Sequence, residues 1–114
     1  MDCLFCKIAS GDIPAKKVFE DEVAIAIHDI NPQAPVHLLV LPRKHIASLA
    51  HMHSPDEDRT LLGNLLASVN RIAAEQLLIH GYRIVINTGS DGGQTVNHLH
   101  FHLLGGRGME WPPG

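Results

Sequence analysis

The 114-residue sequence lacks long hydrophobic runs and clusters of basic residues. No stretch approaches the roughly 20 consecutive apolar residues of a membrane-spanning helix, and residues 1–11 lack the positive start and apolar run of a secretory signal. The net charge is -3 with no basic run, which argues against broad binding to nucleic acid or to a membrane surface. We therefore expect a cytoplasmic protein with no nucleic-acid and no membrane partner.

Cysteine is also scarce, and the two that occur, Cys3 and Cys6, form one C-x-x-C pair. In a reducing compartment such a pair is more often a metal ligand or a redox pair than a structural disulfide. The chain shows no internal repeat and no linker long enough to separate domains. Its length and its 45% hydrophobic content predict a single domain over 1–114 with one modest core.

Apolar patterning predicts two helices and five strands. A short helical turn over 4–8 is followed by strands over 17–21, 23–28 and 36–41. Ser54 can cap a long helix, with Pro55 in the first turn and Glu57 completing a capping box. This helix should reach 78 or 79 and stop at Gly81. Strands over 82–87 and 98–104 complete an α+β fold, a mainly antiparallel sheet with the helix on one face.

The last of these strands carries the most informative pattern, in which His98, His100 and His102 alternate with large apolar residues. Side chains in a strand point to opposite faces in turn, so the three imidazoles share one face, roughly 6.5–7 Å apart, and the apolar residues face the core. A half-exposed edge strand that happens to be rich in histidine is the plain structural interpretation. Three imidazoles in register are a poor choice for packing alone, because imidazole is a mediocre strand former.

A histidine row on one strand face supports two kinds of chemistry. Neutral imidazole is a common metal ligand, and it is also a nucleophile or proton carrier in attack on an electrophile such as phosphorus. The loop before the strand favours the second kind, because Gly92 and Gly93 let backbone N–H groups approach an anion. Ser90 and Thr95 add hydroxyl groups. The same loop is also a plausible hairpin turn.

Residues 98–104 match the histidine-triad motif, His-φ-His-φ-His-φ-φ with φ apolar. The chain resembles the histidine-triad (HIT) family over nearly its whole length, and its Hint branch in particular. The similarity includes segments 13–16, 19–21, 28–35 and 89–94, and the tail over 105–107 and 111–114. Two positions depart from the branch, since Asn97 replaces a common aromatic residue and Thr95 replaces a common serine.

The resemblance implies a HIT-like antiparallel five-stranded sheet with one long and one short helix. It also implies hydrolysis at the α-phosphate of purine nucleoside 5′-phosphoramidates, with AMP- or GMP-type nucleotides as partners. His100 would be the nucleophile that forms a transient nucleotidyl-imidazole. His102 would bind phosphate oxygens and share charge with His37, and His98 would orient the strand and assist proton transfer. No cofactor is required for this chemistry.

The resemblance also implies a nucleotide-binding set. Asp29 matches the carboxylate that binds the ribose hydroxyls, although an Asx turn is a simpler role for it. An apolar slot for the base is formed in the family by residues at the positions of Phe5, Ile8, Ile27, Ile30 and Leu39, all of which would serve equally well as core. The phosphate and the leaving group would be held by Asn87, Gly93, Gln94 and Thr95.

The two cysteines acquire a function through the same resemblance. Related proteins with this C-x-x-C complete a zinc site with the histidine of a Pro-x-x-His segment and the first triad histidine, here His45 and His98. The implied structural Zn²⁺ would therefore be bound by Cys3, Cys6, His45 and His98. A reduced thiol pair and a redox pair are the alternatives, the latter without the βαβ unit that usually follows it.

Two other classes of function stay open. The triad histidines could bind a metal directly, or the protein could sense nucleotides with only incidental catalysis. The family resemblance further implies a homodimer formed through the long helix and the 82–87 strand, with the Trp111 tail reaching toward the partner's site.

Overall fold

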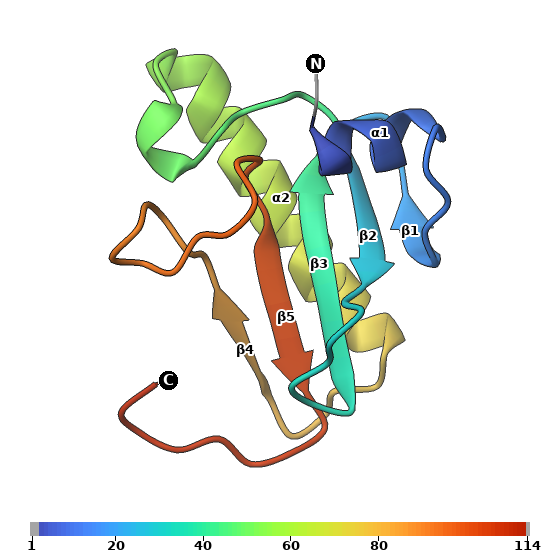
Figure 1. The fold of residues 1–114 in the computed structure, drawn as a ribbon. Coiled ribbons are helices and arrows are strands. Elements are labelled where there is room, and N and C mark those ends of the chain that lie inside the picture. The colour runs from blue at the N-terminus through green and yellow to red at the C-terminus, as the bar shows by residue number, and fades with distance from the viewer. Residues whose placement is uncertain (1–2, 114) are drawn as a thin grey trace.

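The protein, described here from a computed structural model that covers residues 3–113, folds around a five-stranded antiparallel sheet (Figure 1). Met1, Asp2 and Gly114, which include both ends of the predicted 1–114 domain, lie outside the described residues. The strand order is β1-β2-β3-β5-β4, and every neighbouring pair is antiparallel. The strands are β1 Lys17–Glu20, β2 Ala24–His28, β3 Val36–Pro42, β4 Tyr82–Val85 and β5 Phe101–Gly105. The predicted fold class is confirmed.

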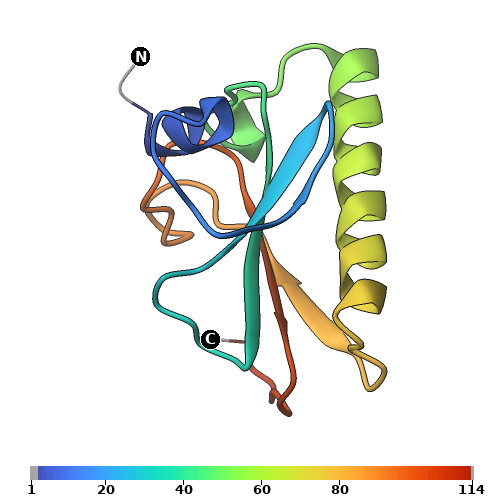
Figure 2. The same cartoon turned by 90° about the vertical axis from the view of Figure 1, so that its right-hand side faces the viewer.

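Two α-helices lie on opposite sides of this sheet (Figure 2). The long helix α2, Pro55–Glu75, runs along one face, and the short helix α1, Leu4–Ser10, sits over one end of the other. A short 3₁₀ turn, Leu49–His51, precedes α2. Among residues 3–113, no helix has both the length and the apolarity needed to cross a membrane.

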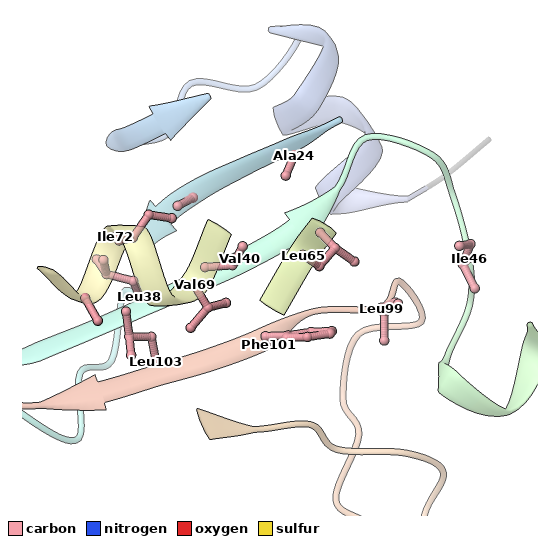
Figure 3. Close-up of a cluster of buried hydrophobic side chains, with 12 residues drawn as sticks. Ala24, Leu38, Val40, Ile46, Leu65, Val69, Ile72, Leu99, Phe101 and Leu103 are labelled. Atoms are coloured by element: carbon pink, nitrogen blue, oxygen red, sulfur yellow. The ribbon is translucent and has the colours of Figure 1, made fainter. Parts of the chain in front are cut away.

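The main core fills the space between α2 and the sheet (Figure 3). Leu65, Val69 and Ile72 recur at helical spacing and pack against alternate residues of the central strands, including Leu38 and Phe101. A second cluster lies beneath α1 and contains Phe5, Ile8, Ile25, Ile27, Leu39 and Leu41. Because both faces of β2 and β3 are covered, these strands are nearly continuously apolar.

The long helix ends earlier than its periodicity predicts. It stops at Glu75, and Leu77 adopts the left-handed conformation with φ of 59°. The N–H groups of Leu77 and Leu78 return to the carbonyls of Ala74 and Ala73, which is the Schellman pattern usually made with glycine. The predicted stop at Gly81 is wrong, because Leu78 is drawn against the core while the exposed Leu77 takes the strained position.

The start of α2 differs in one detail. Ser54 is the N-cap and Pro55 lies in the first turn as predicted, but the Ser54 side chain makes no capping bond. The Ser54 N–H instead donates to the carboxylate of Asp58 at 2.7 Å, whereas Glu57 pairs with Lys44 at 3.3 Å. The capping-box role given to Glu57 is therefore wrong, since Asp58 is the buried acid of the first turn.

The last two strands also begin or end differently from prediction. β4 ends at Val85 rather than at 87, and the ladder of β5 begins at Phe101 rather than at 98. Both changes have one cause, because β5 pairs with β3 and β4 only over 101–105. Residues 98–100 have no partner in the sheet, although the Leu99 N–H donates to the carbonyl of Ile46.

Candidate active site and metal-ligand cluster

The alternation of residues 98–103 persists although only part of the segment is in the sheet. Leu99, Phe101 and Leu103 all belong to the core beneath α2. His98 and His100 lie on the other face, where both rings meet the ring of Phe5 from α1 edge to face, with centroids 5.9 and 5.1 Å apart. The row is not the exposed surface that the pattern suggested, because His98 is 0% and His100 is 6% exposed.

The protonation of His100 is set by its own backbone. Its Nδ1 lies 2.7 Å from the main-chain oxygen of His98. A carbonyl oxygen only accepts hydrogen bonds, so Nδ1 carries the proton. In the neutral form of the ring, the lone pair is therefore on Nε2, the atom that is available to react.

The neighbouring pair of histidines is set by a backbone donor. The N–H of Gln33 donates to Nδ1 of His37 at 3.0 Å, so in the neutral ring the proton is on Nε2. That Nε2 lies 2.9 Å from Nδ1 of His102. His37 is then the donor and His102 the acceptor, which leaves a proton on Nε2 of His102. The centroids of the His100 and His102 rings are 5.1 Å apart.

Both imidazoles of this pair are neutral near pH 7. Burial lowers the pKa of His102 to about 4, with the charges of His100 and His37 acting in the same direction and that of Asp29 acting against them. Burial also lowers the pKa of His37, again opposed by Asp29. A neutral pair matches the single proton that each ring needs for the hydrogen bonds just described.

Asp29 combines both roles considered for it. Its Oδ1 accepts from the N–H of Asn31 at 2.8 Å, which is the predicted Asx turn. Its Oδ2 lies 3.4 Å from Nε2 of His37. The carboxylate therefore stands at the edge of the histidine pair, at the end of β2.

The four predicted zinc ligands come together from three distant segments. Nδ1 of His98 lies 3.3 Å from Sγ of Cys3, 3.5 Å from Sγ of Cys6 and 3.3 Å from Nδ1 of His45. Sγ of Cys6 lies 3.2 Å from Nδ1 of His45. A tetrahedral zinc site has N–N edges of about 3.3 Å and N–S edges of about 3.5 Å, given bonds of about 2.0 Å and 2.3 Å. The donor set fits Zn²⁺.

His98 is also oriented for that purpose. Its Nε2 lies 2.7 Å from the carbonyl oxygen of Pro42, so Nε2 carries the proton and Nδ1 has its lone pair directed at the two thiols. A carbonyl partner on the second ring nitrogen is the usual outer contact of a metal-bound histidine. Burial lowers the pKa of His98, which keeps that lone pair free of a proton.

The glycine loop before the triad is held by side chains. Asn87 donates through Nδ2 to the carbonyl of Gly92 at 2.7 Å. The Gln94 amide accepts from the N–H of Gly89 and donates to the carbonyls of Ala47 and Val96. A Cβ on Gly92 would lie 2.3 Å from the oxygen of Thr88, and Gly93 has a φ of +76°. Both glycines are therefore required by the backbone, while Thr95 is exposed.

The residues predicted to line a base slot separate into two groups. Phe5, Ile8, Ile27 and Leu39 are buried together beneath α1, whereas Ile30 is fully exposed at 101%. The first group forms the floor beneath the histidine row. Ile30 projects from the loop that follows β2 and is the apolar member of the set that a ligand can reach.

Two partners in the site escaped sequence analysis because they are main-chain atoms. The Gln33 N–H fixes His37, and the Pro42 carbonyl fixes His98. Every residue except proline carries the first kind of group and every residue carries the second, so no residue type marks them.

The antiparallel sheet of this α+β protein therefore holds a histidine row, of which His98 and His100 are buried, beside a Cys₂His₂ cluster. The model of the HIT domain family matches residues 10–109, and the chain belongs to this family. It is 54% identical over 113 residues to an uncharacterized HIT-like protein of Synechococcus elongatus, covering 99% of this chain and 97% of that one.

Solved structures of histidine triad proteins have the same fold as this chain. The crystal structure of a HIT family hydrolase from Legionella pneumophila aligns with a TM-score of 0.93 and 55% identity, covering 99% of this chain and 100% of that chain. A zinc-bound histidine triad family protein from Mycobacterium smegmatis aligns with a TM-score of 0.80 and 37% identity over 94% and 76% of the two chains. A histidine triad nucleotide-binding protein from Candida albicans gives 0.81 and 31% over 99% and 85%. The chain has a HIT hydrolase-like fold.

Proposed function

We propose that the protein is a purine nucleotide hydrolase of the Hint branch that acts at the α-phosphate of nucleoside 5′-phosphoramidates. The observation that carries the proposal is the complementary protonation of two neighbouring rings. His100 presents a lone pair on Nε2, and His102 presents an N–H, as their hydrogen bonds require. A nucleophile beside a donor for phosphate oxygens is what phosphoryl transfer needs.

In the first step, Nε2 of His100 attacks the α-phosphorus and the P–N bond to the leaving amine breaks. The N–H of His102 donates to a phosphate oxygen, where negative charge increases in the transition state. The amine departs with a proton taken from water. The His98 carbonyl continues to accept the Nδ1 proton of His100 and so stabilises the positive charge of the nucleotidyl-imidazolium.

In the second step, water attacks the phosphorus and the bond to Nε2 of His100 breaks. The nucleoside monophosphate is released, the water proton leaves to solvent, and the ring returns to its starting tautomer. His37 acts throughout by holding the proton of His102 on Nε2. His98 contributes through its carbonyl rather than as a proton donor, because both of its ring nitrogens are otherwise engaged.

The nucleotide would be bound across the end of β2 and the glycine loop. Asp29 would accept from the ribose hydroxyls, and Ile30 would contact a purine of the adenine or guanine type over the floor of Phe5, Ile8, Ile27 and Leu39. Gly93 and Thr95 would contact the phosphate. The side-chain amides of Asn87 and Gln94 already donate hydrogen bonds to main-chain carbonyls, so their main role would be to hold the loop in its conformation.

We further propose that Cys3, Cys6, His45 and His98 bind a structural Zn²⁺. When bound, the ion would supply a cross-link between α1 and the triad segment, with no part in the reaction. The short edges between the four ligand atoms and the zinc-bound relative support this assignment. Metal-binding thiols suit a reducing compartment, in keeping with a cytoplasmic location.

We further propose a homodimer formed through the long helix α2 and the strand β4. β4 is an edge strand, which offers unpaired backbone groups to a second copy. Leu77, Ile79 and Tyr82 are exposed beside it and line a cleft of about 620 Å³, whose lining includes none of His37, His98, His100 and His102. This apolar border supports a partner chain rather than a small substrate.

The test is hydrolysis of adenosine 5′-phosphoramidate, followed by AMP release, for wild type and His100→Ala with and without EDTA. We expect turnover that survives chelation and falls at least about a thousandfold in the variant. Denaturation of the wild-type protein during turnover should trap the covalent nucleotidyl-protein adduct. Absence of wild-type turnover together with tight AMP binding would instead identify a nucleotide-sensing module.

A further inference from the structure

Gln33 lies in the exposed loop between β2 and β3, yet three of its four polar groups are hydrogen-bonded. Its N–H donates to Nδ1 of His37 at 3.0 Å, and its side-chain Nε2 donates to the carbonyl of Asn31 at 3.0 Å. Its carbonyl accepts from Nε of Arg107 at 2.9 Å. An exposed loop residue is seldom held so completely, which indicates that its position matters.

The approach of Arg107 to this loop is built into the backbone. β3 and β5 pair Val36 with Gly105 and so bring the turn after β5 beside the loop. Gly106 has a φ of +89°, and a Cβ there would lie 2.9 Å from Cβ of Pro35. Only glycine allows this contact. Arg107 follows directly and also donates to the Gly108 carbonyl at 3.2 Å.

We propose that Arg107 is a positioning residue that fixes the tautomers of His37 and His102 by anchoring Gln33. The chain of bonds runs from the Arg107 guanidinium to the Gln33 carbonyl, from the Gln33 N–H to His37, and from His37 to His102. Arg107 itself touches neither ring. The inference deepens the proposed function, since the tautomer of His102 matters because its N–H serves the phosphate.

The physical reason lies in the small energy difference between imidazole tautomers. A free neutral ring populates both N–H forms, and the hydrogen bond at one nitrogen selects which form dominates. If Gln33 is released, Nδ1 of His37 loses its donor and the proton can move there. Nε2 of His37 then becomes an acceptor, and His102 turns its own proton toward it, which leaves only a lone pair for the substrate.

The decisive experiment reads the tautomers directly. Long-range ¹H–¹⁵N correlation spectra at pH 7.5, recorded without substrate, distinguish the two forms of each ring. We expect wild type to show the Nε2–H form of both His37 and His102, and Arg107→Ala to show mixed forms. Phosphoramidate turnover should fall on the order of tenfold, as for outer contacts of functional histidines. Arg107→Lys, which can still donate to the Gln33 carbonyl, should recover most of both signals.

Two further variants separate positioning from general damage. Arg71→Ala removes an exposed arginine that pairs with Glu75 on α2, and it should change neither spectrum nor rate. Gly106→Ala would clash with Pro35 and disturb the turn that carries Arg107, so it should mix the tautomers as Arg107→Ala does.

Pure Nε2–H forms in Arg107→Ala would overturn the inference, as would mixed forms with an unchanged rate. Because the spectra need no substrate, they decide the tautomer claim even where wild type fails to hydrolyse the phosphoramidate, an outcome that sinks the proposed function.

Discussion

Two histidine clusters lie on the same face of this sheet, and they differ in what their outer hydrogen bonds prepare. In the Cys₂His₂ cluster, the Pro42 carbonyl takes the Nε2 proton of His98 and leaves the Nδ1 lone pair facing two thiols. In the cluster of Asp29, His37 and His102, the Gln33 N–H occupies the lone pair of His37 and leaves a proton on Nε2. A carbonyl partner prepares a metal ligand, whereas an N–H partner prepares a proton donor.

This difference bears on the rival idea that the triad region binds a metal directly. The ligand atoms of Asp29, His37 and His102 lie within 4.8 Å of one another, as those of the cysteine cluster do. A metal on Nε2 of His37 would require a proton on Nδ1, which would then oppose the Gln33 N–H at 3.0 Å. The distances between ligand atoms are therefore compatible with a metal in both clusters. The backbone hydrogen-bond partners favour a metal only in the cysteine cluster.

Removal of both thiols should have the largest effect of the changes considered. Cys3→Ser/Cys6→Ser should lose the single tightly bound zinc and several kcal/mol of stability, since the binding free energy of a structural zinc is folding free energy. Metal content after dialysis and Co²⁺ absorption measure the first effect, and thermal unfolding measures the second. One full equivalent of metal remaining in the double variant, and lost on further change of Asp29→Asn, would place the metal at Asp29, His37 and His102.

His37→Asn should break the other cluster with the metal left intact. The Asn oxygen can still accept from the Gln33 N–H, but nothing then donates to Nδ1 of His102. We expect turnover of the phosphoramidate to fall 10- to 100-fold, with one zinc retained per chain. Steady-state rates and metal analysis on the same preparation check both parts, and an unchanged rate contradicts the assignment.

Acid should lower the stability of the protein through the cluster of Asp29, His37 and His102. The pKa of His102 is lowered by burial to about 4 from an ordinary value of 6.5. The unfolded chain therefore binds more protons between these pH values, so stability is full above pH 6.5 and declines as pH falls toward 4. We compare wild type with His102→Gln at equal metal loading. Between pH 7.5 and 4, the free energy of unfolding of wild type should fall by about 2 kcal/mol more than that of the variant, allowing for partial exposure of the ring. Urea midpoints at the two pH values measure this difference.

The smallest expected effect concerns charge. Asp29→Asn keeps the oxygen that accepts from the Asn31 N–H but removes the negative charge 3.4 Å from His37. Because burial keeps His37 neutral at pH 7.5, we expect a stability change under about 0.5 kcal/mol by urea unfolding. A loss above about 1.5 kcal/mol would mean that the ring is charged and that the cluster contains an ion pair.

Much of this architecture follows from local pattern. Alternation over 98–103 is obeyed even where residues 98–100 have no strand partner, because the apolar side chains must still enter the core. The boundaries of the helices and strands were predicted less accurately from this local pattern. The end of α2 at Leu77 and the capping by Asp58 rather than Glu57 depend on which neighbouring side chain is drawn inward, a competition between near-equivalent residues.

The sequence by itself determined the alternation of histidines, the order of strands and helices, and the family, since each rests on periodicity and motif along a continuous stretch. The meeting of Cys3 with His98 across 95 positions was implied by the family resemblance and by no local pattern. Only the tertiary structure decided that Gln33 and Pro42 offer an N–H and a carbonyl to two chemically identical rings. The reason is physical. Backbone donors and acceptors are the same in nearly every residue, so their effect on an imidazole depends on the three-dimensional path of the chain.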